Sequence, residues 1–122
     1  MKTFDSSAWV EYFRGSTAGR KVKDVLEGDE VLFTPSICLA ELKTKYLSEK
    51  HDPSERLQFI KSRTSIIAVD ASVAEAAADL KLRHRLHMVD AIVLACAQSC
   101  GSDLVTGDKH FSGVPGVMML TQ

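Results

Sequence analysis

Short apolar runs alternate along this sequence with longer stretches in which apolar residues recur every three or four positions. The runs predict strands at residues 1–5, 31–34, 66–69, 104–106 and 117–120. The longer stretches predict helices at residues 6–13, 18–27, 36–50, 53–63, 70–85 and 88–97. Because the strands are continuous apolar runs, both faces of their sheet should be covered. The pattern therefore predicts an α/β protein, a three-layer α/β/α sandwich around a five-stranded, mostly parallel sheet.

Polar residues that favour helix N-termini precede several of these helices. Ser6 or Ser7 is the predicted cap of the first helix, and Ser36 of the third. Asp70 or Ser72 is the predicted cap of the alanine-rich helix at 70–85. Such side chains accept hydrogen bonds from backbone N–H groups that have no partner inside the helix.

Length and composition indicate a single globular domain at residues 1–122, with 45% hydrophobic and 25% charged residues. The net charge of -1 argues against a protein that coats duplex DNA through a global basic field. No apolar run reaches membrane-spanning length, and the N-terminus lacks the apolar core of a signal peptide. The three cysteines lack Cys-x-x-Cys spacing. We therefore expect a cytoplasmic protein without membrane association, whose cysteines are reduced and structural.

Asp90 is the residue that least fits its surroundings. Every other residue from Met88 to Ala97 is apolar, and a helix that is apolar all round is a buried helix. A carboxylate in such a helix is costly unless it is paired with a cation or bound to a metal. The sequence therefore raises the question of which cation, and which other acidic residues, accompany Asp90.

Three further acidic residues stand in unusual contexts. Asp5 ends the first predicted strand, Asp108 follows the fourth, and Glu41 lies among apolar residues in the helix at 36–50. In doubly wound sheets, ligands bind beyond the carboxyl ends of the strands, where the strand order reverses. If the first strand is central and the fourth is its neighbour, Asp5 and Asp108 reach the same crevice.

Each acidic residue also has a purely structural interpretation. Asp5 would cap the first helix, and Asp108 would shape a turn. Glu41 would pair with Lys45 one helical turn along, and the helix dipole would stabilise Asp90. Taken together, the four acidic residues favour an acidic metal site. Carboxylates without histidine or cysteine suit Mg²⁺ or Mn²⁺, ions that commonly serve the hydrolysis of phosphate esters.

The four acidic segments resemble the motifs of a known family. Asp5-Ser-Ser-Ala-Trp-Val, Ala-Glu41-Leu, Asp90-Ala-Ile-Val-Leu-Ala and Val-Thr-Gly-Asp108 are similar, in this order, to the motifs of PIN-domain nucleases. The short, single-domain chain resembles the VapC-type toxins of toxin–antitoxin pairs. One departure is His87-Met-Val before Asp90, where the family pattern leads us to expect small or glycine-rich residues.

This resemblance implies a Mg²⁺- or Mn²⁺-dependent endoribonuclease that hydrolyses RNA, is inhibited by a small antitoxin protein and forms a homodimer. It implies that Asp5 and Asp90 are the main metal ligands. Glu41 and Asp108 would complete the catalytic pocket, and Thr106 would form a hydrogen bond within it.

Basic residues near these motifs are, as a group, candidates for binding RNA phosphates, although a solvated helix surface is the favoured interpretation of any single one. The candidates for the substrate site are Arg85, Lys109 and, by its hydroxyl, Thr106. His84 and His87 are three residues apart, whereas His51 and His110 are isolated, and this spacing assigns no role to the histidines.

Two other functions remain open at this stage. The chain has the length and acidic character of a phospho-receiver signalling domain with a Mg²⁺ pocket, in which Asp70 would be the acceptor and Thr106 and Lys109 its companions. A receiver, however, carries paired acids after its first strand, where this chain has Ser6 and Ser7 after Asp5. The other alternative is a catalytically silent PIN-like binding module, which the intact acidic set disfavours.

Overall fold

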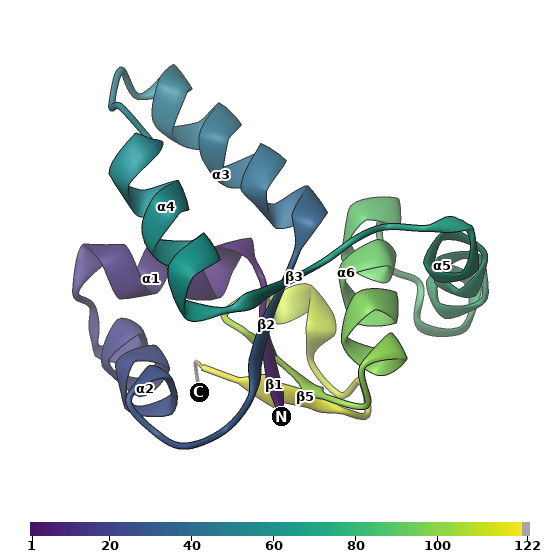
Figure 1. Ribbon diagram of the computed structural model, residues 1–122. Helices are drawn as coiled ribbons and strands as arrows, with labels where there is room; N and C mark the ends of the chain where they lie inside the picture. The colour runs from purple at the N-terminus through teal and green to yellow at the C-terminus, as the bar shows by residue number, and fades with distance from the viewer. Residues whose placement is uncertain (121–122) are drawn as a thin grey trace.

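The computed structural model describes residues 1–120, which form a five-stranded parallel sheet flanked by helices (Figure 1). The strands are β1 (Lys2–Phe4), β2 (Leu32–Pro35), β3 (Ser65–Ile67), β4 (Asp103–Thr106) and β5 (Val117–Met119). The helices are α1 (Ser6–Arg14), α2 (Thr17–Leu26), α3 (Ser36–Ser48), α4 (Ser54–Arg63), α5 (Ala71–His84), α6 (Met88–Ser99) and the short 3₁₀ helix η1 (Lys109–Phe111). The predicted fold class is confirmed, and each predicted element is present with its ends shifted by at most two residues.

The sheet has the strand order β3-β2-β1-β4-β5, with β1 at its centre. Lys2 of β1 pairs with Leu32 of β2 on one side and with Asp103 of β4 on the other. The chain thus builds outward from β1 to β3 and then crosses to β4, so the order reverses between β1 and β4. A parallel sheet presents a crevice for ligands at this point, beyond the carboxyl ends of the two strands.

Two apolar clusters fill the space on the two faces of the sheet. Neighbouring residues of a strand point to opposite faces, and accordingly Leu104 belongs to one cluster and Val105 to the other. The Leu104 cluster lies under α5 and α6, whereas the Val105 cluster contains Trp9 of α1 and Val22 of α2. Figure 1 shows these helix pairs on opposite sides of the strands. Burial on both faces accounts for the consecutive buried residues Leu104, Val105 and Thr106 of β4, whereas the edge strand β3 is largely exposed.

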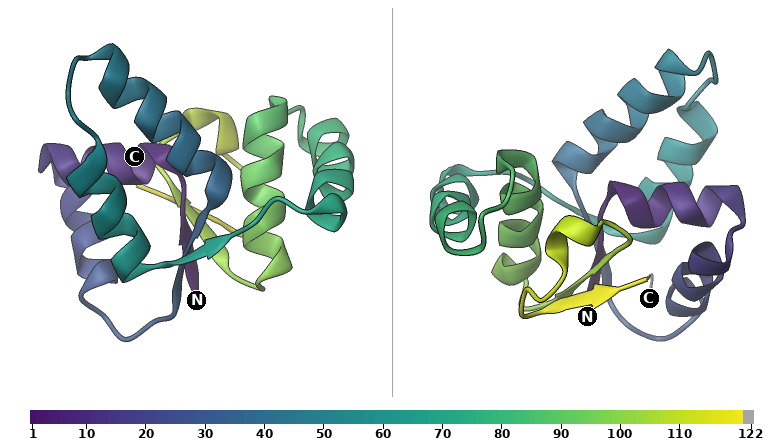
Figure 2. Two further views of the ribbon diagram at one scale, coloured as in Figure 1. Left: turned by 45° about the horizontal axis from the view of Figure 1, so that its top comes forward. Right: turned by 180° about the vertical axis from the view of Figure 1, so that it is seen from behind.

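Helices α3 and α4 extend together beyond the sheet (Figure 2). Cys38, Leu42 and Tyr46 form the buried stripe of α3, at intervals of four residues. The guanidinium of Arg56 in α4 lies 4.7 Å from the centre of the Tyr46 ring and packs against it. Cys38 and Cys96 are buried and Cys100 is half-buried, as expected for structural cysteines.

The structure decides between the two interpretations of the start of α1. Asp5, rather than Ser6 or Ser7, is the cap, because the strand ends at Phe4 and the Asp5 carboxylate accepts a hydrogen bond from the Ala8 N–H at 2.9 Å. Helix α3 likewise begins after Pro35, with Ser36 inside its first turn. The caps of α1 and α3 are therefore each one residue earlier in the chain than the serines suggested.

Asp70, in contrast, caps α5 as predicted, by accepting a hydrogen bond from the Val73 N–H at 2.9 Å. None of the helices within residues 1–120 has the length and hydropathy required to cross a bilayer.

Helices α1 and α2 touch so closely that only glycine fits at position 19. A Cβ atom added to Gly19 would lie 2.0 Å from the Glu11 carbonyl oxygen, a backbone atom. Gly19→Ala should therefore lower the free energy of unfolding by roughly 3 kcal/mol, because the two helices must separate to admit the methyl group. Urea unfolding measures this loss.

Gly28→Ala is the matched control for this substitution. A Cβ atom at Gly28 would lie 3.4 Å from its nearest neighbour, the Val25 carbonyl oxygen, which is an ordinary contact. The control should change the free energy of unfolding by less than about 1 kcal/mol. Equal losses in the two variants would contradict the close packing of α1 on α2.

Candidate metal-binding active site

Asp5 lies at the reversal point of the sheet, between the end of β1 and the start of α1. Its Oδ1 atom accepts hydrogen bonds from the Ser7 hydroxyl at 2.7 Å and from the Ala8 N–H at 2.9 Å. Its Oδ2 atom accepts a hydrogen bond from the Thr106 hydroxyl. Only 6% of Asp5 is exposed, so these contacts fix the direction of a carboxylate that solvent hardly reaches.

The same hydroxyl groups join β1 to β4. The Gly107 N–H donates to Ser7 Oγ at 2.9 Å, and the Asp108 N–H donates to Thr106 Oγ1 at 3.0 Å. Thr106 therefore forms the predicted hydrogen bond in the pocket. Thr106 positions Asp5 and Asp108 through these hydrogen bonds. Its side chain is fully buried, and the predicted contact with substrate remains a prediction.

Glu41 approaches the pocket from α3. The Ser6 hydroxyl donates to Glu41 Oε1 at 2.6 Å, which links α3 to the start of α1. Lys45, the alternative partner of Glu41, instead forms an ion pair with Glu49 at 2.6 Å. The structural interpretation of Glu41 as half of a pair with Lys45 is therefore wrong, and its carboxylate stands at the exposed rim of the site.

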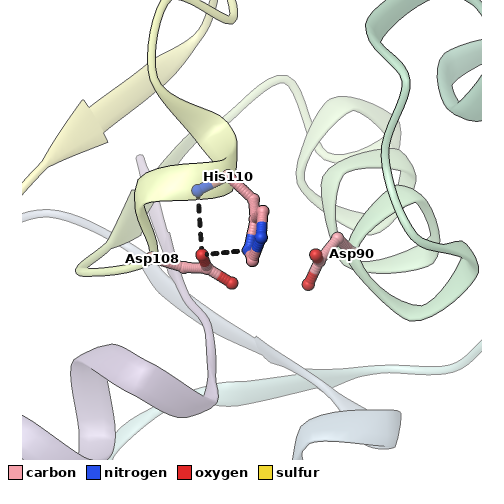
Figure 3. A group of neighbouring side chains, drawn as sticks. All are labelled: Asp90, Asp108 and His110. Atoms are coloured by element: carbon pink, nitrogen blue, oxygen red, sulfur yellow. Dashed lines mark hydrogen bonds and ion pairs between the residues drawn. The ribbon is translucent and has the colours of Figure 1, made fainter.

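Asp90 and Asp108 form the centre of the candidate site together with His110 (Figure 3). Each of the three offers one ligand atom, and these atoms lie within 4.8 Å of one another. Asp90 comes from the first turn of α6 and is half-buried. Asp108 precedes η1 and accepts hydrogen bonds at Oδ1 from the backbone N–H of His110. Within residues 1–120, this group brings Asp90 together with Asp108, and Asp5 lies outside it.

His110 is the residue of this group that the sequence did not identify. Its Nδ1 atom lies 2.8 Å from Asp108 Oδ1. The spacing of the four histidines gave no signal, because His110 meets two acidic residues, of which Asp90 comes from a distant part of the chain. The one indication in the sequence that His110 belongs to the site was its position two residues after Asp108.

Two of the carboxyl groups are shifted toward their protonated forms. Burial raises the pKa of Asp5 from its ordinary value of 3.8 to about 6, although the hydrogen bonds to its oxygens act in the opposite direction. Burial also raises the pKa of Asp90, and the nearby charges of Asp108 and Glu41 raise it further. Asp108 also raises the pKa of Asp5. The four predicted carboxylates thus lie in one electrostatic neighbourhood, which a cation would stabilise.

Other residues considered from the sequence lie elsewhere or remain predictions. Asp70 follows the edge strand β3 and caps α5, two strands away from β1. Arg85, at the C-terminus of α5, and Lys109, next to Asp108, are exposed, and their proposed contacts with RNA phosphates remain predictions.

A profile of the family described as the PIN domain matches residues 2–117 of this chain. The chain belongs to the PIN domain family. The predicted resemblance to PIN domains, based on the four acidic motifs, is therefore confirmed. Among curated protein sequences, none matches this chain.

Solved structures that share this PIN fold include toxin–antitoxin complexes. A toxin–antitoxin complex from Klebsiella pneumoniae has a TM-score of 0.84 and 24% identity, and covers 100% of this chain and 99% of that chain. VapBC2 from Rickettsia felis, bound to a DNA fragment from its promoter, has a TM-score of 0.77 and 18% identity, with coverages of 97% and 96%. VapC20 from Mycobacterium tuberculosis, described as a Sarcin-Ricin loop cleaving toxin, has a TM-score of 0.72 and 18% identity, with coverages of 94% and 95%.

The donor set of this PIN domain fits a divalent cation. Carboxylate oxygens and one imidazole nitrogen converge from α6 and from the segment after β4. Burial, together with the nearby charge of Asp108, raises the pKa values of Asp5 and Asp90, so negative charge at either carboxyl group is unfavourable without a cation. A bound cation compensates such charge directly, because carboxylate and imidazole are both ligands of divalent metals.

The raised pKa of Asp5 predicts how the stability of the metal-free protein depends on pH. Between about pH 4 and pH 6 the folded protein retains a proton on Asp5 that the unfolded chain has released, since the folded-state pKa is about 6. The stabilisation is fully present below the unfolded pKa and is lost as the pH rises through about 6. An increase from 3.8 to about 6 corresponds to roughly 3 kcal/mol at most.

Asp5→Asn should flatten this decline, because an amide does not ionise in this range and still accepts the capping bond from Ala8. Urea unfolding in the presence of a chelator, at several values between pH 4 and pH 7, measures the slope for each protein. Asp79→Asn, at an exposed position of α5, is the matched control and should keep the slope of the unsubstituted protein. An equally steep slope in Asp5→Asn would contradict the burial of this carboxyl group.

Proposed function

We propose that this chain is a Mg²⁺- or Mn²⁺-dependent endoribonuclease that hydrolyses RNA phosphodiester bonds, and that it is the toxin of a toxin–antitoxin pair. The observation that carries this proposal is the meeting of Asp90 and Asp108, beside Asp5, at the reversal point of a PIN-family sheet. Acidic residues at such a place suit the binding of a hard divalent cation.

Membership of the PIN domain family supports nuclease activity in general, and the structural neighbours support the narrower assignment. One neighbour is described as a toxin that cleaves the Sarcin-Ricin loop, and others are toxin–antitoxin complexes. The neighbours cover almost the whole length of this chain. We infer an RNA substrate from these descriptions together with the acidic site.

The side chains of the site divide into three roles in this proposal. Asp90 and Asp108 would hold the cation together with Asp5, because the family resemblance implies that Asp5 and Asp90 are the main metal ligands. A bound divalent cation supplies an activated water and neutralises charge on the scissile phosphate and on the leaving oxygen. Thr106 holds Asp5 in one direction, and Glu41 at the rim would orient water or substrate.

Arg85 and Lys109 are proposed to bind phosphates of the RNA on either side of the scissile bond. Both are exposed and positively charged, and Lys109 adjoins Asp108 in the chain. Cations beyond the metal are needed because each nucleotide brings a phosphate charge to an already acidic pocket.

The strand order disfavours a phospho-receiver. Receivers of the flavodoxin type have the order 2-1-3-4-5, in which the third strand lies inside the sheet. Here β3 is an edge strand, and Asp70 caps α5. Asp70 therefore lacks the acidic neighbours that a Mg²⁺-dependent phosphate acceptor needs.

Cleavage of RNA by the purified protein, with and without Mn²⁺ or Mg²⁺, tests the proposed activity. Asp5→Asn and Asp90→Asn should each lower the cleavage rate roughly 100-fold or more, as expected when a catalytic group is removed. Asp79→Asn on the exposed face of α5 should cleave at the unsubstituted rate.

Cleavage that persists in a chelator, or in both site variants, would overturn the proposal. A chain that folds and binds Mn²⁺ but leaves every RNA intact would instead support a catalytically silent PIN module. Unfolding midpoints of the variants, measured in parallel, show whether lost activity reflects lost structure.

We also propose a cytoplasmic location, a small antitoxin protein as partner and a homodimer as the working form. The support is the family resemblance and the toxin–antitoxin complexes among the structural neighbours. Sedimentation equilibrium of the Asp90→Asn chain should give about twice the chain mass of 13.4 kDa, and a single-chain mass at micromolar concentration would contradict the dimer.

A further inference from the structure

The imidazole of His110 stands beside the two carboxylates of the candidate site, although the proposed function gives it no role. Figure 3 shows the His110 ring between Asp108 and Asp90, with the Asp90 carboxylate facing the ring. Asp108 and His110 come from the segment after β4, whereas Asp90 comes from α6. The three side chains thus converge from two separate elements.

The spacing of these groups is close to that of ligands around one ion. Their ligand atoms lie within 4.8 Å of one another. In an octahedral site with bonds of about 2.1 Å, two ligands on opposite sides of the ion are about 4.2 Å apart. Small side-chain rotations therefore suffice to place all three around a single cation.

The contact with Asp108 also prepares the histidine to act as a ligand. Nδ1 of His110 lies 2.8 Å from Asp108 Oδ1. Two adjacent ligands of an ion with bonds of about 2.1 Å are about 3.0 Å apart, so Nδ1 and Oδ1 can bind one cation as neighbours when the ring proton is on Nε2. The other oxygen of Asp108 points toward the Asp90 side of the site and is free of this hydrogen bond (Figure 3).

The ring of His87 packs against the ring of His110. The rings of His87 and His110 have their centres 5.3 Å apart and meet edge to face at 84°. His87 is the N-cap residue of α6, immediately before the turn that carries Asp90. The exposed ring of His110 is therefore in contact with both Asp108 and His87.

We propose that His110 supplies an imidazole nitrogen to the cation held by Asp90 and Asp108, so that the site selects first-row transition ions over Mg²⁺. The proposal rests on the metal site of the proposed function and adds a nitrogen ligand to it. Imidazole suits transition ions, whereas Mg²⁺ favours oxygen ligands and retained water. An all-carboxylate site would not discriminate between Mg²⁺ and Mn²⁺ in this way.

Pulsed electron paramagnetic resonance of the Mn²⁺-loaded protein tests this ligand without any substrate. The unsubstituted protein should show coupling of the Mn²⁺ electron spin to a directly bound ¹⁴N nucleus, and His110→Ala should lack it. Titration calorimetry should show Mn²⁺ affinity falling at least about 10-fold in His110→Ala. The affinity for Mg²⁺ should change less than about 3-fold, because Mg²⁺ gains little from the nitrogen.

His110→Asn separates a ligand from a residue that only positions Asp108. Asparagine keeps a hydrogen-bond donor near the place of Nδ1 but has no imidazole nitrogen with a free lone pair. It should lose the ¹⁴N coupling and the preference for Mn²⁺ as fully as His110→Ala does. His51→Ala, in the connection between α3 and α4, is the matched histidine control and should keep both.

An unsubstituted protein that binds Mn²⁺ without ¹⁴N coupling would overturn the proposal, as would full Mn²⁺ preference in His110→Asn. These outcomes leave the nuclease assignment standing if RNA is still cleaved. Conversely, a protein that shows the ¹⁴N coupling but cleaves no RNA would support His110 as a metal ligand. The same result would contradict the proposed nuclease function.

Discussion

Burial of carboxyl groups near other acidic side chains, beyond the carboxyl ends of β1 and β4, is the constraint to which the rest of this structure responds. The fold places Asp5, with 6% exposure, and half-buried Asp90 near Asp108 and Glu41. Burial is the largest cause that raises the pKa values of Asp5 and Asp90, and the charge of Asp108 raises both further, so the metal-free fold carries an electrostatic cost there. A site that only stabilised the fold would not concentrate like charges in this way, whereas a cation-binding site requires them.

The surrounding elements hold this unfavourable arrangement in place. Apolar packing on both sheet faces fixes β1 and β4, and α6 is anchored by buried residues that follow Asp90 along the helix. Hydroxyl groups of Ser7 and Thr106 join the two strand ends and direct the Asp5 carboxylate. Rigid elements of this kind keep charged side chains in a fixed geometry, which lowers the cost of assembling a metal site when the ion binds.

The sequence predicted the elements, the sheet and the four acidic residues because each depends on local patterns. Continuous apolar runs give buried strands, and an acid such as Asp90 in an apolar helix is visible without any structure. What could not be predicted depends on contacts between distant residues. The pairing of Asp90 with His110 joins α6 to the turn after β4, and the link from Ser6 to Glu41 joins α1 to α3. The sequence left the cap of α1 open because Asp5, Ser6 and Ser7 are all good caps, and the end of β1 decides among them.

The most direct measurement is the melting temperature of the metal-free protein as Mn²⁺ is added. A cation that binds only the folded state at about 100 times its dissociation constant adds about 2.7 kcal/mol of stability, or roughly 10 °C for a domain of this size. If Asp90 and Asp108 hold the ion, the unsubstituted protein should show this increase and the double variant Asp90→Asn, Asp108→Asn should show none. An unchanged melting temperature in the unsubstituted protein, or an equal increase in the double variant, would contradict the presence of a cation site at the ends of β1 and β4.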